Sequence, residues 1–460
     1  MLIVISDLHL VDGTCGKPIS ASAFQLFAAR LNELAFNASW RADKRYRPLD
    51  GIDILLLGDI LDPLHSTLWL DKSPGEPGTV RPWTDIHAPE YAAKVQAITQ
   101  AITQAILKYN AEAIETLRHI AEGQFIRLPT ATSRGRGALN TKEQVTVPVR
   151  IHYMIGNHDW YYHIPGQVFD RIRQEIIKAL GLANPNSPFP HEVKDSETLQ
   201  RLFTSYKIYA QHGDLYDSFN YCRNRGRNAA TLGDAFSVEV LNRFPVVAQK
   251  RLGQELLPGI IEGLRELVNV RPALATPLWI SGQLRQNNIS LADQKKIKKV
   301  WDDISDEFLS LPFMRAADKK FKLDIVDGLE LIVKLTDRFS FKDIDDVVVW
   351  IRNQFWSGEI TFAKHALKEE AFLDRTAQFI VYGHTHHHEI VPLDSIPSMP
   401  RPTNQMYMNS GTWHTYYDLA VFKPEEQKFV PYPVLSYLSF FKEDEREGRR
   451  FETWSGAFSD

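Results

Sequence analysis

The sequence predicts an α/β (α+β) fold whose buried strands end at one shared polar edge. Two observations support this prediction. Five apolar runs have the length and character of buried strands, and each run ends in a short polar cluster. The runs are Leu2–Ser6, Ile54–Leu57, Ile151–Ile155, Tyr206–Ala210 and Phe379–Tyr382. Because open sheets place their sites at the carboxyl ends of the strands, we expect the polar side chains to converge there.

The polar clusters contain residue types that bind metal ions. In chain order they are Asp7-Leu8-His9, Gly58-Asp59-Ile60-Leu61-Asp62, Gly156-Asn157-His158-Asp159, His212-Gly213-Asp214 and Gly383-His384-Thr385-His386. Carboxylate, imidazole and amide ligands together suit manganese, iron or zinc better than magnesium or calcium. A single Asp-x-His has little specificity, but all five clusters in this order, each after a strand, indicate one dinuclear metal centre.

This order of motifs resembles the calcineurin-like metallophosphoesterase superfamily, in a bacterial-type form with a large helical insertion. The superfamily pattern is D-x-H, G-D-x-x-D, G-N-H-[DE], H and G-H-x-H, and every part is present here. The resemblance implies a four-layer αββα sandwich of two mixed β-sheets flanked by helices. The C-terminal strands are expected to complete the second sheet. It further implies a metal-dependent phosphoric ester hydrolase.

The resemblance also assigns roles to single residues. The implied ligands are Asp7, His9 and His386 for the first metal ion, Asn157, His212 and His384 for the second, and Asp59 for both. The two divalent ions are expected to be manganese, with iron and zinc as alternatives. His158 and Asp159 are the candidate catalytic residues: His158 would assist the leaving group, and Asp159 either accepts a hydrogen bond from its ring or caps a turn. Asp62 would orient a ligand or cap the following helix.

The chain divides into a core and a long insertion. Residues 1–215 and 376–440 are expected to form the core, 216–375 an inserted helical cap subdomain beside the site, and 441–460 a C-terminal tail. Within the core, apolar residues of 89–123 recur at steps of three and four, which predicts one long helix. The segment Thr130–Thr146 is expected to be an exposed loop. Helical patterns in the insertion cover Ile260–Val270, Leu291–Leu309 and Ala363–Leu373.

An arginine-rich segment follows the fourth cluster closely. Arg223, Arg225 and Arg227 lie in the stretch Arg-Asn-Arg-Gly-Arg. Arginine binds phosphate oxygens through paired donors, so these residues are candidate substrate contacts. A solvated loop is the alternative, because arginine-rich turns are common on protein surfaces.

Composition restricts the compartment and the partners. Two cysteines in 460 residues make a disulfide framework implausible. The first predicted strand begins at Leu2, and no apolar run reaches the length of a membrane span. We therefore expect a cytoplasmic protein without a transmembrane segment. A net charge of −4 does not favour nucleic acid as a partner, and the oligomeric state is left open.

Several functions fit the motifs. The leading expectation is hydrolysis of a phosphomonoester or a small phosphodiester by metal-activated hydroxide, with the insertion selecting the leaving group. Alternatives are a nuclease acting on DNA or RNA ends, and a hydrolase of lipid-linked or nucleotide-sugar pyrophosphates. A non-catalytic protein-binding scaffold is disfavoured because no motif residue is missing.

Overall fold

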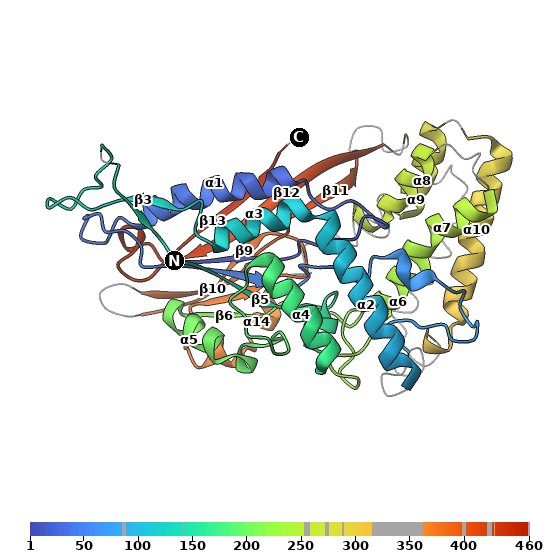
Figure 1. The fold of residues 1–460 in the computed structure, drawn as a ribbon, viewed down its shortest axis with the longest axis horizontal. Helices are drawn as coiled ribbons and strands as arrows, with labels where there is room; N and C mark the ends of the chain where they lie inside the picture. The colour runs from blue at the N-terminus through green and yellow to red at the C-terminus, as the bar shows by residue number, and fades with distance from the viewer. Residues whose placement is uncertain are drawn as a thin grey trace.

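Two β-sheets stacked face to face form the centre of the protein (Figure 1). The computed structural model describes residues 1–84, 89–140, 142–252, 258–271, 276–287, 289–314, 362–397, 402–420, 426 and 428–458.

The first sheet has seven strands in the order β5-β2-β1-β12-β11-β7, with β13 also paired to β12. Their bounds are β1 (Leu2–Ile5), β2 (Ile52–Leu57), β5 (Val149–Met154), β7 (Val270–Arg271), β11 (His414–Leu419), β12 (Phe429–Phe440) and β13 (Phe451–Ala457). Strands β1, β2 and β5 run parallel, and β12 pairs antiparallel with β1. The three parallel strands therefore end at the same edge.

The second sheet has four strands in the order β6-β8-β10-β9. Their bounds are β6 (Ile208–Ala210), β8 (Phe379–Tyr382), β9 (Glu389–Ile396) and β10 (Thr403–Asn409). Strand β8 runs parallel to both β6 and β10. A separate hairpin joins β3 (Arg127–Pro129) to β4 (Gln144–Thr146), so the predicted loop Thr130–Thr146 ends in a short strand.

Alternate residues of β1 show the layers directly. Ile3 and Ile5 pack in the core under the helices, whereas Leu2 and Val4 pack between the two sheets. The covering helices are α1 (Ala21–Ala38), α2 (Pro89–Tyr109), α3 (Ala111–Ala121) and α4 (Gln167–Leu180), while α5 (Glu197–Tyr206) packs beside the layer between the sheets. On the outer face of the second sheet, Ala363 and Ala366 of α14 (Ala363–Ala366) pack with Tyr382. The predicted αββα sandwich is confirmed.

The predicted helix 89–123 is wrong in one respect, because it is two helices. Helix α2 ends at Tyr109 and α3 begins at Ala111. The amide of Asn110 donates to the carbonyl oxygens of Val11 and Ile106, each at 2.8 Å. The apolar pattern continues through this break, since both helices pack on the same sheet, and so periodicity alone does not reveal it.

The C-terminal region also departs from expectation. Strands β11, β12 and β13 join the first sheet, and only β9 and β10 complete the second. The expected tail 441–460 contains β13, which pairs with β12 from Phe440 opposite Phe451 to Val434 opposite Ala457. The tail prediction is wrong because seven consecutive pairings make this segment part of the core.

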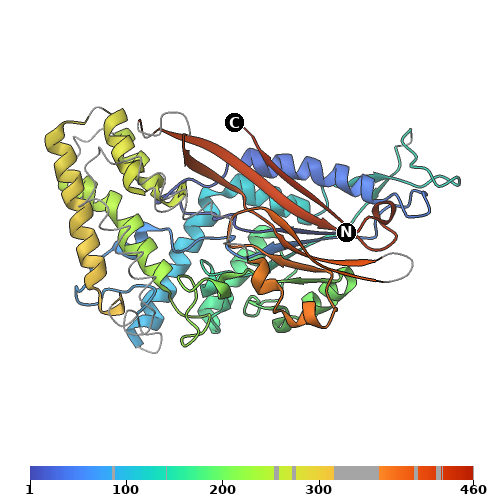
Figure 2. The same ribbon diagram turned by 180° about the vertical axis from the view of Figure 1, so that it is seen from behind.

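The insertion forms a group of helices at one end of the sandwich (Figures 1 and 2). It contains α6 (Leu232–Phe236), a π-helix (Ser237–Asn242), α7 (Arg243–Leu252), α8 (Pro258–Arg265), α9 (Thr276–Gln286) and α10 (Leu291–Ser310). These helices have their own apolar core, against which Tyr417 and Phe429 of the first sheet pack.

The insertion boundaries need two corrections. Strand β7 extends the first sheet beside β11, so the insertion is not wholly helical. Helices α14 and α15 (Glu370–Leu373) cover the second sheet, so Ala363–Leu373 belongs to the core rather than to the cap. Residues 315–361 of the predicted cap lie outside the described residues. No described helix combines the length and the apolar character needed to cross a bilayer.

Candidate metal centre

The five motif loops meet at the carboxyl ends of β1, β2, β5, β6 and β8. The chain turns sharply at several of them, with φ positive at Asp7, His9, Asp59, His384 and His386. Left-handed backbone is uncommon for residues other than glycine and costs about 1–3 kcal/mol each. Such conformations concentrate at functional sites, where surrounding contacts hold them in place.

One group of donor atoms comes from Asp7, His9 and His386, which could hold a metal ion. His386 Nε2 lies 3.2 Å from Asp7 Oδ1 and 3.0 Å from His9 Nε2. Asp7 is fully buried, and among the described residues its Oδ1 atom faces the imidazole of His386 as a possible ion-pair partner but makes no well-formed hydrogen bond. A buried carboxylate oxygen without a donor is costly unless a cation faces it.

The second group comes from Asp59, His212 and His384, which could also hold a metal ion. His212 Nε2 lies 3.1 Å from Asp59 Oδ2 and 3.2 Å from Asn157 Oδ1. The same Asp59 oxygen lies 3.8 Å from His9 Nε2 of the first group. Asp59 therefore stands between the two groups. All seven predicted ligands are brought together at one place.

Hydrogen-bond partners outside the two donor groups fix the orientation of the candidate histidine rings. Nδ1 of His212 lies 2.9 Å from the carbonyl oxygen of Leu57, so it carries the proton and leaves Nε2 free. His386 Nδ1 lies 2.8 Å from the hydroxyl of Tyr416. His384 Nε2 lies 3.0 Å from Asp217 Oδ2, so Nδ1 is the nitrogen of this ring that could bind a metal ion.

Two charge effects at the centre favour cations. Burial lowers the pKa of His212, but Asp59 and Asp7 outweigh it and raise the pKa to about 10. The carboxylates therefore attract a cation, either a proton or a metal ion, to this ring. Burial also raises the pKa of Asp217, but the hydrogen bond from His384 lowers it to about 2.

Two motif glycines are needed because the site is tight. A Cβ atom at Gly156 would lie 2.4 Å from Asp59 Oδ1 and 2.7 Å from His212 Nε2. Gly58 has φ of +86°, and a Cβ there would lie 2.3 Å from His212 Nδ1. The backbone approaches the ligands so closely that only glycine fits. The donor set, the orphaned Asp7 oxygen and this packing together fit bound metal ions.

A cavity of about 220 Å³ opens over both groups. Besides the motif residues, its lining includes Lys17, His65, Asp217, Asn220, Asn269 and His414. Asn220 and Asn269 belong to the insertion, which therefore contributes one wall. Trp413 does not line the cavity and is fully buried against Phe24 and Phe27.

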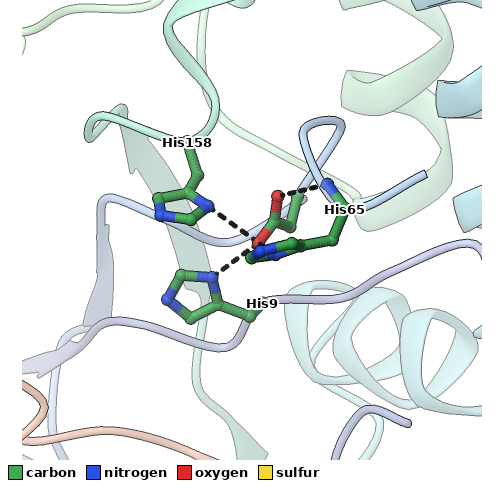
Figure 3. A group of neighbouring side chains, drawn as sticks. His9, His65 and His158 are labelled. Carbon is green, nitrogen blue, oxygen red and sulfur yellow. Dashed lines mark hydrogen bonds and ion pairs between the residues drawn. The ribbon is translucent and has the colours of Figure 1, made fainter. Parts of the chain in front are cut away.

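Asp62 is the centre of a histidine cluster formed by His9, His65 and His158, which Figure 3 labels. Its Oδ2 atom lies 2.8 Å from His9 Nδ1, 2.7 Å from His65 Nδ1 and 2.9 Å from His158 Nδ1. Burial lowers the pKa of His158, but Asp62 and Asp59 outweigh it and raise the pKa to about 10. Asp62 thus links a candidate ligand, His9, to the candidate leaving-group residue.

Of the two roles expected for Asp159, its contacts favour the turn-capping one over pairing with His158. The Asp159 oxygens accept from the Tyr153 hydroxyl at 2.6 Å and from the backbone N–H groups of Ile60 and Gly156 at 3.0 and 2.6 Å. Burial and the charge of Asp59 raise the pKa of Asp159 to about 7. Its role is to hold two motif loops together, which is closer to the turn-capping alternative.

The arginine segment does not line the metal cavity. Arg227 donates to Asp214 Oδ1 at 2.7 Å, and Arg225 lies over the ring of Phe313, 4.7 Å from its centroid. Both line a second hollow with Lys194 and His191, and Arg223 is exposed. None of the three arginines is among the residues that line the metal cavity, whereas Lys17 is.

Three contributors were not found from the sequence. Asp217 and Tyr416 contact ligand rings, and His65 contacts Asp62. His65 follows Asp62 by three residues in the same loop, and this short spacing weakly indicates that the two side chains could be in contact. The other two contacts join distant parts of the chain and have no local pattern.

Comparison with known proteins assigns no family. No protein-family model matches the chain, and no curated protein is significantly similar to it. The resemblance therefore rests on the five motifs themselves.

Proposed function

We propose that this protein is a metal-dependent phosphoric ester hydrolase acting on a phosphomonoester or a small phosphodiester. The observation that carries the proposal is the position of Asp59 between two groups of donor atoms, 3.1 Å from His212 and 3.8 Å from His9. A carboxylate that faces both groups can hold two metal ions close together, as a dinuclear centre needs.

Two divalent ions bound by the seven ligands would neutralise phosphoryl oxygens and supply hydroxide at neutral pH. Manganese is the ion we propose, with iron and zinc as alternatives, on the mixed oxygen and nitrogen donor set. Asn157 donates a carbonyl oxygen without adding negative charge, which keeps the site attractive to an anionic ester.

A side chain of the protein, His158, is the proposed proton donor to the leaving group. His158 lines the cavity and contacts Asp62, and the charges of Asp62 and Asp59 raise its pKa to about 10. We propose that it gives a proton to the departing oxygen, a contribution typically worth about 10²–10⁴-fold in rate. His158 is not one of the seven proposed ligands, although it belongs with His9, Asp62 and His65 to a further group that could hold a metal ion.

The cavity supports a small substrate over a polymer. About 220 Å³ accommodates a phosphoryl group and a compact leaving group. Among the described lining residues, Lys17 is the only lysine or arginine, whereas nucleic acid binding needs an extended basic surface.

The test is hydrolysis by metal-depleted protein after addition of manganese, iron or zinc. The substrates are p-nitrophenyl phosphate, bis-p-nitrophenyl phosphate, nucleotides, a nucleotide-sugar pyrophosphate and single-stranded DNA. Metal-dependent turnover of a small ester supports the proposal. Preference for DNA or for the pyrophosphate would favour those alternatives, and no turnover with two bound metals would favour a scaffold.

A further inference from the structure

His65 is the buried neighbour of the site that the proposed function does not use. Its Nδ1 atom makes the shortest of the three imidazole contacts to Asp62 Oδ2, at 2.7 Å. The other oxygen of Asp62 accepts from the backbone N–H groups of Leu64 and His65, at 3.1 and 3.2 Å. Asp62 is therefore held by its own loop at both oxygens.

Asp62 is the hydrogen-bonding partner of the His65 ring. His65 is 8% exposed, and its Nε2 atom has no hydrogen-bond partner within the described parts of the chain. Buried polar atoms are normally paired, and leaving one unpaired costs about 1–3 kcal/mol. The contact with Asp62 is therefore the property that histidine adds at this position.

The loop carrying His65 is held from two sides. Trp69 Nε1 donates to the carbonyl oxygen of Pro63 at 2.7 Å, and Asn242 Nδ2 donates to that of Leu64 at 2.8 Å. Asn242 ends the π-helix of the insertion and is fully buried. The insertion therefore sets where His65, and through it Asp62, can lie.

We propose that His65 is a positioning residue for leaving-group departure, an inference that rests on the proposed function. Its N–H holds Asp62 Oδ2 at the point where it reaches both His9 and His158. Without that donor, Asp62 Oδ2 keeps its contacts to His9 and His158 but loses the side-chain contact that its own loop supplies. The direction of the His158 ring toward the leaving oxygen is then less firmly fixed. Residues that hold a functional side chain in place through a hydrogen bond typically contribute about 10–100-fold in activity.

The experiment compares two variants with the wild-type protein. His65→Leu keeps the volume and removes the donor, whereas His65→Asn places an amide N–H close to the former Nδ1 position. Each is assayed on paired aryl phosphoesters that differ only in leaving group, phenol against p-nitrophenol, with metal content measured on the same samples. His163→Leu is the matched control, because His163 lies outside the metal cavity and contacts Phe189.

We expect His65→Leu to lower kcat about 10–100-fold for the phenol ester and less than about 3-fold for the nitrophenol ester. A poor leaving group needs the proton, whereas nitrophenolate departs without it. KM and metal content should stay near the wild-type values. His65→Asn should recover most of the phenol-ester rate, which a purely structural role would not explain.

Three results would overturn the inference: equal losses with both esters, an asparagine variant no better than the leucine variant, or a third metal ion lost with His65. The last would make the histidine cluster around Asp62 a metal site instead. If His65→Leu fails to fold, the asparagine variant decides alone: a wild-type leaving-group dependence supports the inference, and loss of the phenol-ester rate in a folded, metal-loaded sample contradicts it. An inactive wild-type protein would instead contradict the proposed function.

Discussion

Asp62 Oδ2 and His158 Nδ1 lie 2.9 Å apart, although 96 residues separate them in the chain. The contact places a buried carboxylate beside a ring that lines the cavity; it orients the ring, and its charge raises the pKa of His158. A group that must donate a proton to a departing oxygen needs both properties.

Replacing His158 should separate rate from metal binding. His158→Ala should lower kcat about 10²–10⁴-fold for esters of poor leaving groups and much less for nitrophenyl esters. Elemental analysis should find the wild-type metal content. Loss of metal in this variant would instead identify His158 as a ligand.

Replacing Asp59 should affect both metal ions at once. Asp59→Asn removes the negative charge between the two donor groups, so we expect at least about a 100-fold loss of activity and fewer than two metals per chain. Asp53→Asn is the matched control, because Asp53 lies on β2, the strand that precedes Asp59, and contacts Arg150 rather than the site. Full activity with two bound metals in Asp59→Asn would contradict the bridging role.

A single methyl group at Gly156 should damage the centre. The added Cβ of Gly156→Ala would lie 2.4 Å from Asp59 Oδ1, so either the loop or the carboxylate must move. We expect a loss of about 1–3 kcal/mol in unfolding free energy and weaker metal binding. Gly259→Ala is the control, since its nearest neighbour would be Asn287 Oδ1 at 3.9 Å. Metal titration followed by calorimetry measures both effects.

Lys17 should contribute to substrate binding. It lines the metal cavity and is exposed, so Lys17→Met should raise KM roughly 2–5-fold, with kcat nearly unchanged. Arg223→Met should leave KM unchanged, because Arg223 is exposed and lines neither cavity. The reverse result would restore the arginine segment as a substrate contact.

Acid should weaken the fold through Asp53. Burial opposes ionisation of Asp53, but hydrogen bonds from His152 and Arg150 outweigh it and hold its pKa below the ordinary value. Because the folded pKa is the lower one, the stabilisation is present above about pH 4 and is lost as pH falls below it. Asp53→Asn should cost roughly 1–3 kcal/mol at pH 7.

The difference between wild-type and Asp53→Asn should shrink as pH falls from 4 toward 2. Urea unfolding at several pH values measures it, with the metal removed from both samples so that metal loss in acid does not contribute. A difference independent of pH would show that the charge of Asp53 does not stabilise the fold.

The local sequence determined the strands and the motif residues. Apolar runs such as Phe379–Tyr382 are buried strands because no other element buries so short a run on both faces. Parallel strands share an edge, and so residues as distant as Asp7 and His384 could be expected at one place. The break at Asn110 and the strand β13 were missed, because a side-chain bond to Val11 and pairing with β12 are contacts between distant segments.

Only the tertiary structure decided which groups contact the side chains of the candidate site. Asp62 rather than Asp159 faces His158, because the loop after β2 crosses the end of β5, and adjacency in sequence does not set that distance. Two of the arginines have other partners: Arg227 donates to Asp214, and Arg225 lies over the ring of Phe313. Residue type and strand order determine which atoms can bind a metal, but hydrogen-bond partners depend on ångström distances that arise only when the loops pack together.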